Sequence, residues 1–342
     1  MRFYCGLDLS ARSCQVCVID GRMKVLVQQK VRNDLEDIMY LLAPFKKTLE
    51  CVVESTFNWY WLVDGLQEGG YEVCLAHTLG LSMITGAKVK TDPRDALALA
   101  KLLRAGMIPK AYVYPKETRP VRDLARRRIR VVNLRAQEYV SLGRLLLQQG
   151  TLDYRRYDIK LIIEEDIEGL FRNPWIQLNA KHELARIRLY TAQIREMEGK
   201  ISETIKDSLK YSRLLDIPGI GKILAITIFY EVGDISRFPS DRDFSSYSRV
   251  VTGVAQSGTS CKKGRGSKQG SSYLKWAFSQ AAVYAVKNYP KIQRFYERQR
   301  RRHRGKGEKL IAYSIVAHKL ALAVYHILRD GTKYNEEILF RN

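Results

Sequence analysis

The chain has 342 residues, 46% of them hydrophobic, which is enough for two or three domains with packed cores. Its formal net charge of +22 at pH 7 indicates a polyanionic partner, and nucleic acid is the favoured one. No uninterrupted apolar run approaches the roughly 18 residues that span a bilayer, and the first residues have a strand pattern instead of a signal peptide. These features argue against a membrane protein and predict a cytoplasmic one.

Six cysteines are scattered along the chain, five of them in apolar, strand-like runs. This distribution is typical of buried thiols in a reducing compartment. Cys14 and Cys17 have the spacing of a zinc knuckle, but no second Cys/His pair of matching spacing follows. A structural zinc ion needs four ligands, so the sequence argues against a zinc site.

In the first third of the chain, strand patterns are followed by an alternation of helices and strands. Apolar, β-prone runs predict five strands, at residues 3–9, 13–19, 24–31, 48–53 and 71–76. Helical patterns are expected at residues 33–45, with Asn33 as the cap, at residues 57–67, and after the fifth strand. The first three strands predict an antiparallel meander, and the alternation that follows predicts parallel crossovers in an α/β sheet.

The stretch Lys-Val-Lys-Thr-Asp-Pro-Arg-Asp-Ala, at residues 88–96, carries the first candidate site. Asp92 suits the capping position of a helix and Pro93 suits its first turn. Asp92 and Asp95 are three residues apart, so they share a helix face and could bind one cation. The surrounding basic residues suit an anion such as a phosphate backbone: Lys88, Lys90 and Arg94. The alternative is a capped surface helix with local ion pairs.

Two further acids occupy strand positions. Asp8 lies within the otherwise apolar run Tyr-Cys-Gly-Leu-Asp-Leu-Ser, where a buried charge is costly unless it is paired or binds a metal. Glu54 ends the fourth strand, at the carboxyl edge where α/β sheets place their sites. If the first and fourth strands are neighbours, Asp8 and Glu54 converge with Asp92 and Asp95 on one edge of the sheet.

The strand order and these four acids resemble the RuvC-like branch of the ribonuclease H fold. More narrowly, they resemble the DEDD transposases and invertases of bacterial insertion sequences, the group that includes the Piv invertase. The usual Lys-Thr-Asp-Xaa-Xaa-Asp-Ala signature of that group matches residues 90–96. Gly-Leu-Asp-Leu-Ser, at residues 6–10, also resembles the first phosphate loop of sugar kinases and actin-like ATPases. That alternative requires a second Gly-rich phosphate loop in a second, similar domain, and we find none in the sequence.

The middle of the chain has two long helical patterns, at residues 119–149 and about 177–211. The first contains consecutive arginines that are candidates for nucleic-acid contact: Arg126, Arg127 and Arg128. The second has apolar residues at alternating spacings of three and four, which is typical of a coiled-coil seam: Ile187, Tyr190, Ile194, Met197 and Ile201. Together they predict an antiparallel hairpin that serves as a dimerisation arm with a basic, nucleic-acid-facing side. The alternative is a helical linker with a solvated basic face.

Residues 215–222, Leu-Asp-Ile-Pro-Gly-Ile-Gly-Lys, lie between two helical patterns and resemble a helix-hairpin-helix turn. Gly219 and Gly221 would let backbone amides approach a DNA phosphate, and Lys222 opens the following helix with its positive end. The alternative is a tight turn between two helices.

Residues 247–274 resemble the C-terminal domain of the same DEDD transposases. Ser257-Gly258 matches the Ser-Gly step of the family, residues 268–270 match the end of its basic loop, and Leu274 lies in the helix that follows. The resemblance implies that Ser257 is a nucleophile. On the residues alone, a serine in a Ser-rich loop is more often a hydrogen-bonding turn residue.

The match around the serine is looser at two positions, since Arg249 stands where the family commonly has glycine and Thr252 where it commonly has proline. Cations next to Ser257 would stabilise the charge of a phosphoryl transfer: Lys262, Lys263, Arg265 and Lys268. No local base is evident, so the carboxylates would come from another part of the assembly. A later basic run, before a helical pattern at 309–329, adds candidate nucleic-acid contacts: Arg300, Arg301 and Arg302.

The predicted fold is α/β plus α, with a RuvC-like, ribonuclease H-like domain at residues 1–115, a helical coiled-coil region at 116–210 and a mainly helical C-terminal transposase domain at 211–342. The resemblance implies an insertion-sequence recombinase in which Asp8, Glu54, Asp92 and Asp95 hold Mg²⁺ or Mn²⁺ and Ser257 forms a covalent link to DNA.

The resemblance also implies donor and target DNA as partners, a structured noncoding guide RNA, a homodimer or homotetramer with an active site shared between protomers, and a bacterial, nucleoid-associated location. Two alternatives remain open. One is a RuvC-like nuclease that resolves branched DNA by hydrolysis, and the other is a nucleic-acid-binding scaffold whose acids are structural.

Overall fold

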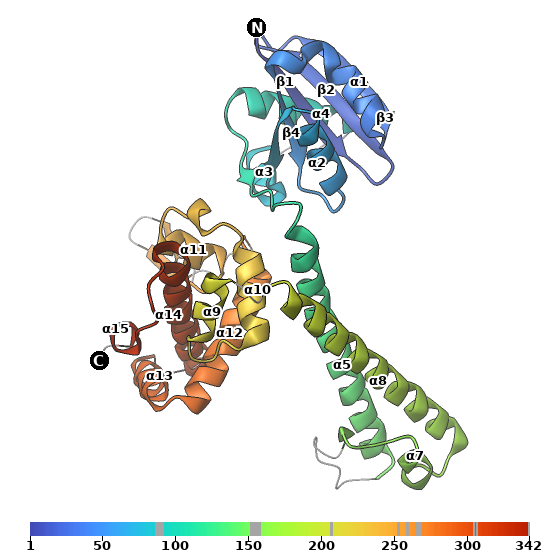
Figure 1. Cartoon of the computed structure of the whole chain (residues 1–342), viewed down its shortest axis with the longest axis vertical. Helices are drawn as coiled ribbons and strands as arrows, with labels where there is room; N and C mark the ends of the chain where they lie inside the picture. The colour runs from blue at the N-terminus through green and yellow to red at the C-terminus, as the bar shows by residue number, and fades with distance from the viewer. Residues whose placement is uncertain are drawn as a thin grey trace. The chain divides into compact units, whose positions relative to one another are not determined.

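The computed structural model describes residues 1–85, 92–150, 159–205, 208–251, 254–257, 260–263, 269–303, 305 and 307–340. The chain divides into two compact units, Met1–Lys116 and Glu117–Asn342 (Figure 1). Each unit has its own hydrophobic core, and each is described by itself.

The first unit is built on a six-stranded sheet of order β3-β2-β1-β4-β5-β6. Its strands are β1 (Phe3–Leu9), β2 (Ser13–Asp20), β3 (Val25–Arg32), β4 (Leu49–Glu54), β5 (Glu72–Ala76) and the short β6 (Lys110–Ala111). The first three strands form an antiparallel meander, β4 and β5 run parallel to β1, and β6 pairs antiparallel with β5. The five predicted strands are confirmed. The first and fourth strands are neighbours, which is the condition on which the convergence of Asp8 and Glu54 depended.

Helices cover both faces of this sheet, which gives a three-layer α/β arrangement compatible with a ribonuclease H-like fold (Figure 1). The helical segments are α1 (Leu35–Leu42), the 3₁₀ helix η1 (Ala43–Thr48), α2 (Tyr60–Glu68), α3 (Thr78–Thr85) and α4 (Asp92–Arg104). Apolar residues of α1 and α2 pack with one face of the sheet, whereas α3 and α4 contribute to the clusters on the other face.

Two local predictions in this unit were wrong, and one helix was missed. The cap of α1 is Asp34, whose carboxylate accepts hydrogen bonds from the Glu36 and Asp37 amides, while Asn33 binds elsewhere. The helix ends at Leu42 and gives way to a 3₁₀ helix that begins with Ala43-Pro44, because proline lacks the N–H that a longer α-helix would use. Helix α3 was not predicted, because its eight residues are mostly apolar and carry little helical periodicity.

Helix α4 lies directly on β1 at Gly6. A Cβ atom at this position would be 2.0 Å from the carbonyl oxygen of Ala96 and 2.8 Å from the amide nitrogen of Ala100. Ala96 and Ala100 are fully buried, so small side chains on both sides let the helix backbone approach the strand. The two ends of α4 are tied to the meander, because Gln28 Nε2 donates to Pro93 O at 3.1 Å and Arg104 Nε donates to Gly21 O at 2.7 Å.

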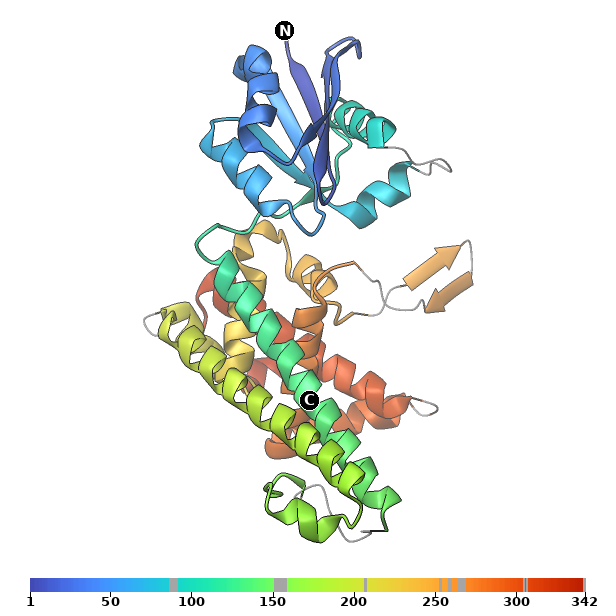
Figure 2. The same cartoon turned by 90° about the vertical axis from the view of Figure 1, so that its right-hand side faces the viewer.

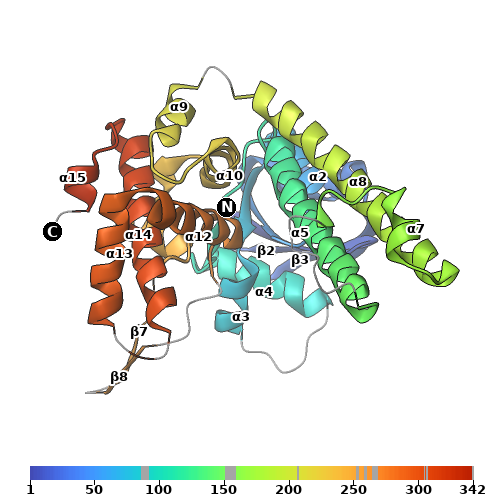
Figure 3. The same ribbon diagram turned by 90° about the horizontal axis from the view of Figure 1, so that it is seen from below.

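The second unit begins with two long helices, α5 (Arg119–Gln148) and α8 (Pro174–Glu203), with the short α7 (Asp166–Leu170) between them in sequence (Figure 3). Polar contacts between the long helices pair positions in opposite order along the chain: Arg128–Glu198, Arg135–Thr191, Ser141–Glu183 and Glu138–Arg186. The predicted antiparallel hairpin is therefore present. The second helix ends at Glu203 instead of continuing to residue 211, where a separate helix has already begun.

The predicted coiled-coil seam faces the interior of this hairpin. Ile187 packs with Leu142 and Leu146 of α5, and Ile201 belongs to a cluster that includes Ala125, also of α5. Ile187, Ile194 and Ile201 are at most 4% exposed within the single chain. The seam is therefore occupied by α5, and the heptad pattern by itself is no evidence for a second protomer.

The rest of the second unit is mainly helical. Its elements are α9 (Leu209–Leu215), α10 (Lys222–Val232), the 3₁₀ helix η2 (Ile235–Arg237), α11 (Asp241–Tyr247), β7 (Val254–Ser257), β8 (Ser260–Lys263), α12 (Ser272–Asn288), α13 (Pro290–Arg302), α14 (Glu308–Asp330) and α15 (Glu336–Leu339) (Figures 1 and 2). Helix α14 confirms the predicted last long helix and supplies much of the core. It is long and apolar enough to cross a membrane, but 50% of its most apolar window is buried in the fold, as in a core helix.

We predict that Gly6→Ala destabilises the first unit by about 1–3 kcal/mol or more, because the added methyl group must push the backbone of α4 away from β1. Gly21→Ala is the matched control, since the nearest atom to its Cβ would be Arg2 O at 4.0 Å. Urea unfolding of the full chain measures both. Equal midpoints for the two variants would contradict the inferred contact.

Candidate active site and nucleic-acid contacts

Asp8 and Glu54 lie next to each other at the carboxyl ends of neighbouring parallel strands. Leu7 of β1 pairs with Val53 of β4, so the two acids are the next residues along their strands. Leu7 and Val53 belong to the core cluster on the α1/α2 face. Because side chains alternate along a strand, the two acids face the side covered by α4. Both are half-buried.

The turns that follow these acids are fixed by hydrogen bonds. The side-chain amides of Asn33 and Asn58 both donate to Ser10 O at 3.0 Å, two residues beyond Asp8. The Ser55 amide donates to Ala76 O at 3.0 Å, directly after Glu54. The ends of β1 and β4 are thus held by neighbouring segments, which limits the movement of both carboxylates.

Asp92 and Asp95 begin α4, on the same face of the sheet. Asp95 is half-buried and immediately precedes Ala96, whose carbonyl oxygen lies against Gly6. Asp92 is the first residue of the helix, and its side chain lies outside the described part of the structure. Among the side chains that are described, no three of Asp, Glu, His or Cys are grouped as a metal site. The structure thus brings Asp8 and Glu54 together and puts the backbone at the start of α4 on their face.

The register of the meander adds two residues to this edge that the sequence did not single out. Asp8 pairs with Gln15 of β2, and Gln15 pairs with Lys30 of β3. Gln15 is only 5% exposed, which is unusual for a glutamine, whereas Lys30 is exposed. Gln15 is a polar residue in the otherwise apolar run Cys14–Ile19, and it lies opposite Asp8 in the hairpin of the first two strands. These two features together could have identified it from the sequence.

The two cysteines with zinc-knuckle spacing lie on opposite faces of β2. Cys14 belongs to the cluster on the α1/α2 face, and Cys17 packs with Ala96 and Ala100 of α4. They cannot bind one ion together. Burial, with a smaller contribution from Asp8, raises the pKa of the Cys14 thiol to about 12, and burial raises the pKa of Cys17 to about 11.

Ser257 is the last residue of β7 and pairs with Ser260, the first residue of β8. The basic stretch that the sequence predicted as a loop therefore contains a short antiparallel hairpin. Its strands of four residues are too short for alternation to be recognised in the sequence. Lys262 and Lys263 belong to β8, and their side chains, like that of Ser257, are not described. Arg265 and Lys268 lie outside the described residues, as do Lys88 and Lys90 of the first unit.

The base of this hairpin segment is held by hydrogen bonds to backbone carbonyl oxygens. The Ser271 amide donates to Tyr247 O at 2.7 Å, and Arg249 Nε donates to Gln269 O at 3.0 Å. Gly270 has φ +94°, and a Cβ there would lie 2.2 Å from Tyr247 O. Arg249 has φ +54°, a conformation that favours glycine. Glycine is the residue that is common at this position in the family that this stretch resembles.

A buried charge cluster anchors the same base to the helical core. Glu231 of α10 is 1% exposed and binds the Arg126 guanidinium of α5 through both carboxylate oxygens, the longer contact being 2.9 Å. Arg122 Nε lies 3.6 Å from Glu231 Oε1, and Ser271 Oγ donates to Oε2 at 3.0 Å. The Ser271 hydroxyl also accepts from the Leu274 amide and so caps α12. Glu231 thereby connects α5, α10 and the end of the hairpin segment.

The predicted arginine contacts on α5 differ in their partners. Arg126 binds Glu231 and stacks on the Tyr273 ring at 4.4 Å, and Arg128 donates to Glu198 at 2.8 Å and 2.5 Å. Arg127 is exposed. Of the three, Arg127 is the candidate for phosphate contact.

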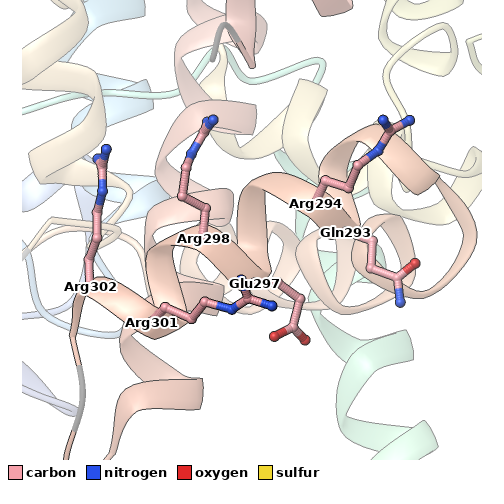
Figure 4. Close-up of a pocket in the computed structure, with 6 residues that line it drawn as sticks. All are labelled: Gln293, Arg294, Glu297, Arg298, Arg301 and Arg302. Carbon is pink, nitrogen blue, oxygen red and sulfur yellow. The ribbon is translucent and has the colours of Figure 1, made fainter.

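Helix α13 has a row of arginines that differs from the predicted trio. Arg300 hydrogen-bonds to Glu308 at 2.8 Å and to Glu297 at 3.2 Å, and its hydrogen bond lowers the pKa of Glu308. Figure 4 shows Arg294, Arg298 and Arg302, spaced four residues apart, pointing to the same side of a groove of about 600 Å³. The predicted Arg301 also lines this groove, but its side chain points toward Glu297 instead of joining the row (Figure 4). The four-residue spacing of Arg294, Arg298 and Arg302 could have predicted this row, but the prediction rested on the adjacent arginines at residues 300–302 instead.

Two family models match the chain. One, described as a transposase and defined for DEDD transposases of the IS110 type, matches residues 5–150, which contain all four predicted acids. The other, described as the transposase IS116/IS110/IS902 family, matches residues 211–297, which contain Ser257 and the buried Glu231. The two matches together cover more than half of the chain.

Similar proteins come from several bacteria. The y4qE protein of Sinorhizobium fredii is 25% identical over 70% of this chain and 58% of its own length. A protein of Pseudomonas aeruginosa assigned to the family 20 transposases is 25% identical over 79% of this chain and 80% of its own length. The transposase for insertion sequence element IS1533 of Leptospira borgpetersenii is 24% identical over 72% of this chain and 74% of its own length.

An α/β unit with acids at the carboxyl edge of its sheet, followed by a second matching transposase domain, defines the class as transposases. Within that class, the chain belongs to the IS110 family of DEDD transposases.

We predict that Glu231→Gln lowers the free energy of unfolding by about 3–5 kcal/mol, because it removes the buried negative charge that faces Arg122 and Arg126. Glu203→Gln is the control, since Glu203 pairs with Lys200 on the surface, and it should cost at most about 1 kcal/mol. Urea unfolding of the full chain measures both changes. A Glu231→Gln midpoint equal to that of the control would show that the cluster does not stabilise the unit.

Proposed function

We propose that this protein is an insertion-sequence recombinase that cuts and rejoins DNA with a divalent metal ion and a serine nucleophile. The observation that carries the proposal is the adjacency of Asp8 and Glu54 at the ends of β1 and β4, on the face where α4 begins with Asp92. A pair of acids at this edge, in a chain of the IS110 family, fits phosphoryl transfer better than a structural ion pair does.

The acids are suited to Mg²⁺ or Mn²⁺. Both ions prefer carboxylate oxygens, and none of the four predicted residues supplies a sulfur or nitrogen ligand. We infer that Asp8, Glu54, Asp92 and Asp95 would hold the metal, which would supply positive charge at the phosphate and favour deprotonation of a nucleophile. Buried Gln15, beside Asp8, would orient the carboxylate, and Lys30 at the rim would contact the DNA backbone.

Ser257 would attack the scissile phosphorus through Oγ. A new phosphorus–oxygen bond would form to the serine as the bond to one DNA oxygen breaks, and the proton lost by the serine hydroxyl balances the one that the departing DNA oxygen gains, so that DNA end leaves as a hydroxyl. Attack by a second DNA hydroxyl on the phosphoserine would then rejoin the strands and restore Ser257. Because the bond energy is kept in the phosphoserine, strands are exchanged without hydrolysis.

The acids and Ser257 belong to different compact units. We infer that one active site draws on both units, from the same protomer or from two protomers of a homodimer or homotetramer. The net charge of +22 and the basic row Arg294, Arg298 and Arg302 support an extended nucleic-acid partner. We include a structured noncoding guide RNA, together with donor and target DNA, among the proposed partners.

Ser257→Ala should abolish a protein–DNA adduct that survives denaturation, because no other group replaces the serine oxygen. The assay incubates the full chain with its insertion-sequence DNA, its noncoding RNA and Mg²⁺, then separates adducts in SDS. Ser260→Ala is the matched control, since Ser260 pairs with Ser257 across the hairpin, and it should keep the adduct. Cleavage that persists in Ser257→Ala would instead favour the RuvC-like nuclease, in which water is the nucleophile.

Asp8→Asn should weaken Mn²⁺ binding by more than about a hundredfold, since even residues that only orient metal ligands contribute about 10- to 100-fold. Calorimetric titration of the full chain with Mn²⁺ measures this directly. Asp37→Asn, an exposed acid on α1, should bind Mn²⁺ like the unmodified chain. Equal affinity in both variants, with adduct formation retained in Asp8→Asn, would favour structural acids.

A further inference from the structure

A groove of about 640 Å³ lies within the second unit, between the turn that precedes α10 and one face of α12. Its lining residues come from α5, the end of α9, the turn, the first residues of α10, and α12 with the residue that follows it. Among them are Arg128, Gly219, Gly221, Lys222, Trp276 and Tyr284. No lining residue that the structure describes is acidic, so the groove suits an anionic occupant.

The turn is fixed against α12. Gly219 has φ +85°, and a Cβ there would lie 2.2 Å from the carbonyl oxygen of Ala281. Ile217 and Ile220 on either side are at most 3% exposed, and the Ile220 amide donates to Ile217 O at 3.0 Å. The predicted helix-hairpin-helix glycine is thus required by packing, and this packing holds the start of α10 beside α12.

The start of α10 is open to an anion. The helix has eleven residues and begins at Lys222, and its cap, Gly221, provides no side-chain hydrogen bond to the first amides. A Cβ at Gly221 would have no atom within 4 Å, so space remains in front of these amides. Lys222 is exposed at the same point. Backbone N–H groups at a helix start, with a lysine beside them, form a phosphate site.

The opposite wall is an aromatic row. Trp276, Gln280 and Tyr284 lie four residues apart on one face of α12, and Tyr289 follows the helix. Tyr284 is 58% exposed, Tyr289 is 37% exposed and Trp276 is half-buried. Trp276 and Tyr284 are separated by about 12 Å along the helix axis, the length of roughly three to four stacking steps of about 3.4 Å. The row can therefore contact more than one base, and Gln280 between the rings can hydrogen-bond to base edges.

Such a combination selects unpaired nucleic acid over a duplex. In a duplex the base faces are stacked on each other, so the aromatic row would have no partner and only the phosphate site would bind. In a single strand, base faces are free to stack on Trp and Tyr while the backbone follows the cations.

We propose that this groove binds an unpaired segment of DNA or RNA, with bases stacked on Trp276 and Tyr284 and a phosphate at the start of α10. The proposal rests on the proposed function for the presence of nucleic acid, and it names the form in which that nucleic acid is bound in the second unit.

Fluorescence anisotropy with labelled oligo-dT, oligo-U and a DNA duplex of the same length tests the proposal on the full chain. Tyr284→Ala should weaken binding of at least one single strand roughly 5- to 150-fold, the effect of losing one base stack, and should change duplex binding little. Whether oligo-dT or oligo-U responds identifies DNA or RNA as the source of the unpaired segment. Tyr40→Ala is the matched control, since Tyr40 is 81% exposed on α1 of the first unit, and it should bind as the unmodified chain does.

Trp276 contributes to packing, so its role is tested by a conservative change. Trp276→Phe keeps an aromatic face and should retain most of the single-strand affinity. Oligonucleotide binding should quench the fluorescence of Trp276 in the unmodified chain, and this part of the quenching should be lost in Trp276→Phe. Lys222→Gln should weaken single-strand and duplex binding alike, because it acts on phosphate.

Three results would overturn the proposal. Tyr284→Ala could bind both single strands unchanged, it could lose duplex and single-strand binding equally, or it could change only the mass of the assembly in light scattering, which would make the groove a protein-docking surface. The serine-adduct assay separates this outcome from failure of the proposed function: Tyr284-dependent oligonucleotide binding without any serine adduct would retain the groove and reject the recombinase chemistry.

Discussion

The contact between α4 and β1 is the constraint on which the first unit depends. A helix backbone can approach a strand this closely only if both elements carry small residues at the crossing, and Gly6, Ala96 and Ala100 meet that requirement. The crossing lies two residues before Asp8 and one residue after Asp95. Close packing of small residues therefore sets the positions of acids from distant parts of the sequence, so that side-chain size at the crossing controls the geometry of the candidate site.

In the second unit, a buried charge cluster instead of a small-residue contact holds the candidate site segment in place. Buried Glu231 receives arginines from α5 and a serine that caps α12, so electrostatics instead of small-residue packing fixes the base of the serine hairpin. A buried carboxylate is expensive to desolvate, and here hydrogen bonds from Arg126 and Ser271, together with the positive charge of Arg122, offset that cost. The alternative of an apolar contact at this point would pack the helices but would not fix the direction of the chain as it leaves the hairpin.

The meander and the parallel crossovers were predictable because they depend on local patterns and on short, right-handed connections. The convergence of Asp8 with Glu54 followed from the sequence only on the condition that the first and fourth strands are neighbours, which the structure meets. Gln15 and Lys30 were not predictable, since their proximity to Asp8 depends on hairpin register, which a turn fixes only once its exact length is known. The roles of Arg126 and Arg300 were hidden for another reason. A run of arginines does not reveal which members will meet a carboxylate from elsewhere in the fold, such as Glu231 or Glu308.

The hydrogen bond between Tyr247 and Ser271 closes the base of the hairpin segment. The sequence of the segment can therefore change independently of the sequence that stabilises the helical core. Because the ends of the hairpin segment are held together by the helical core, the entropic cost of the segment depends only weakly on its length, and each doubling adds about 0.6 kcal/mol. Insertions, deletions and new basic residues within the segment leave Glu231 and its partners untouched. Selection can therefore change the length and charge of this segment while the stability of the helical unit stays constant.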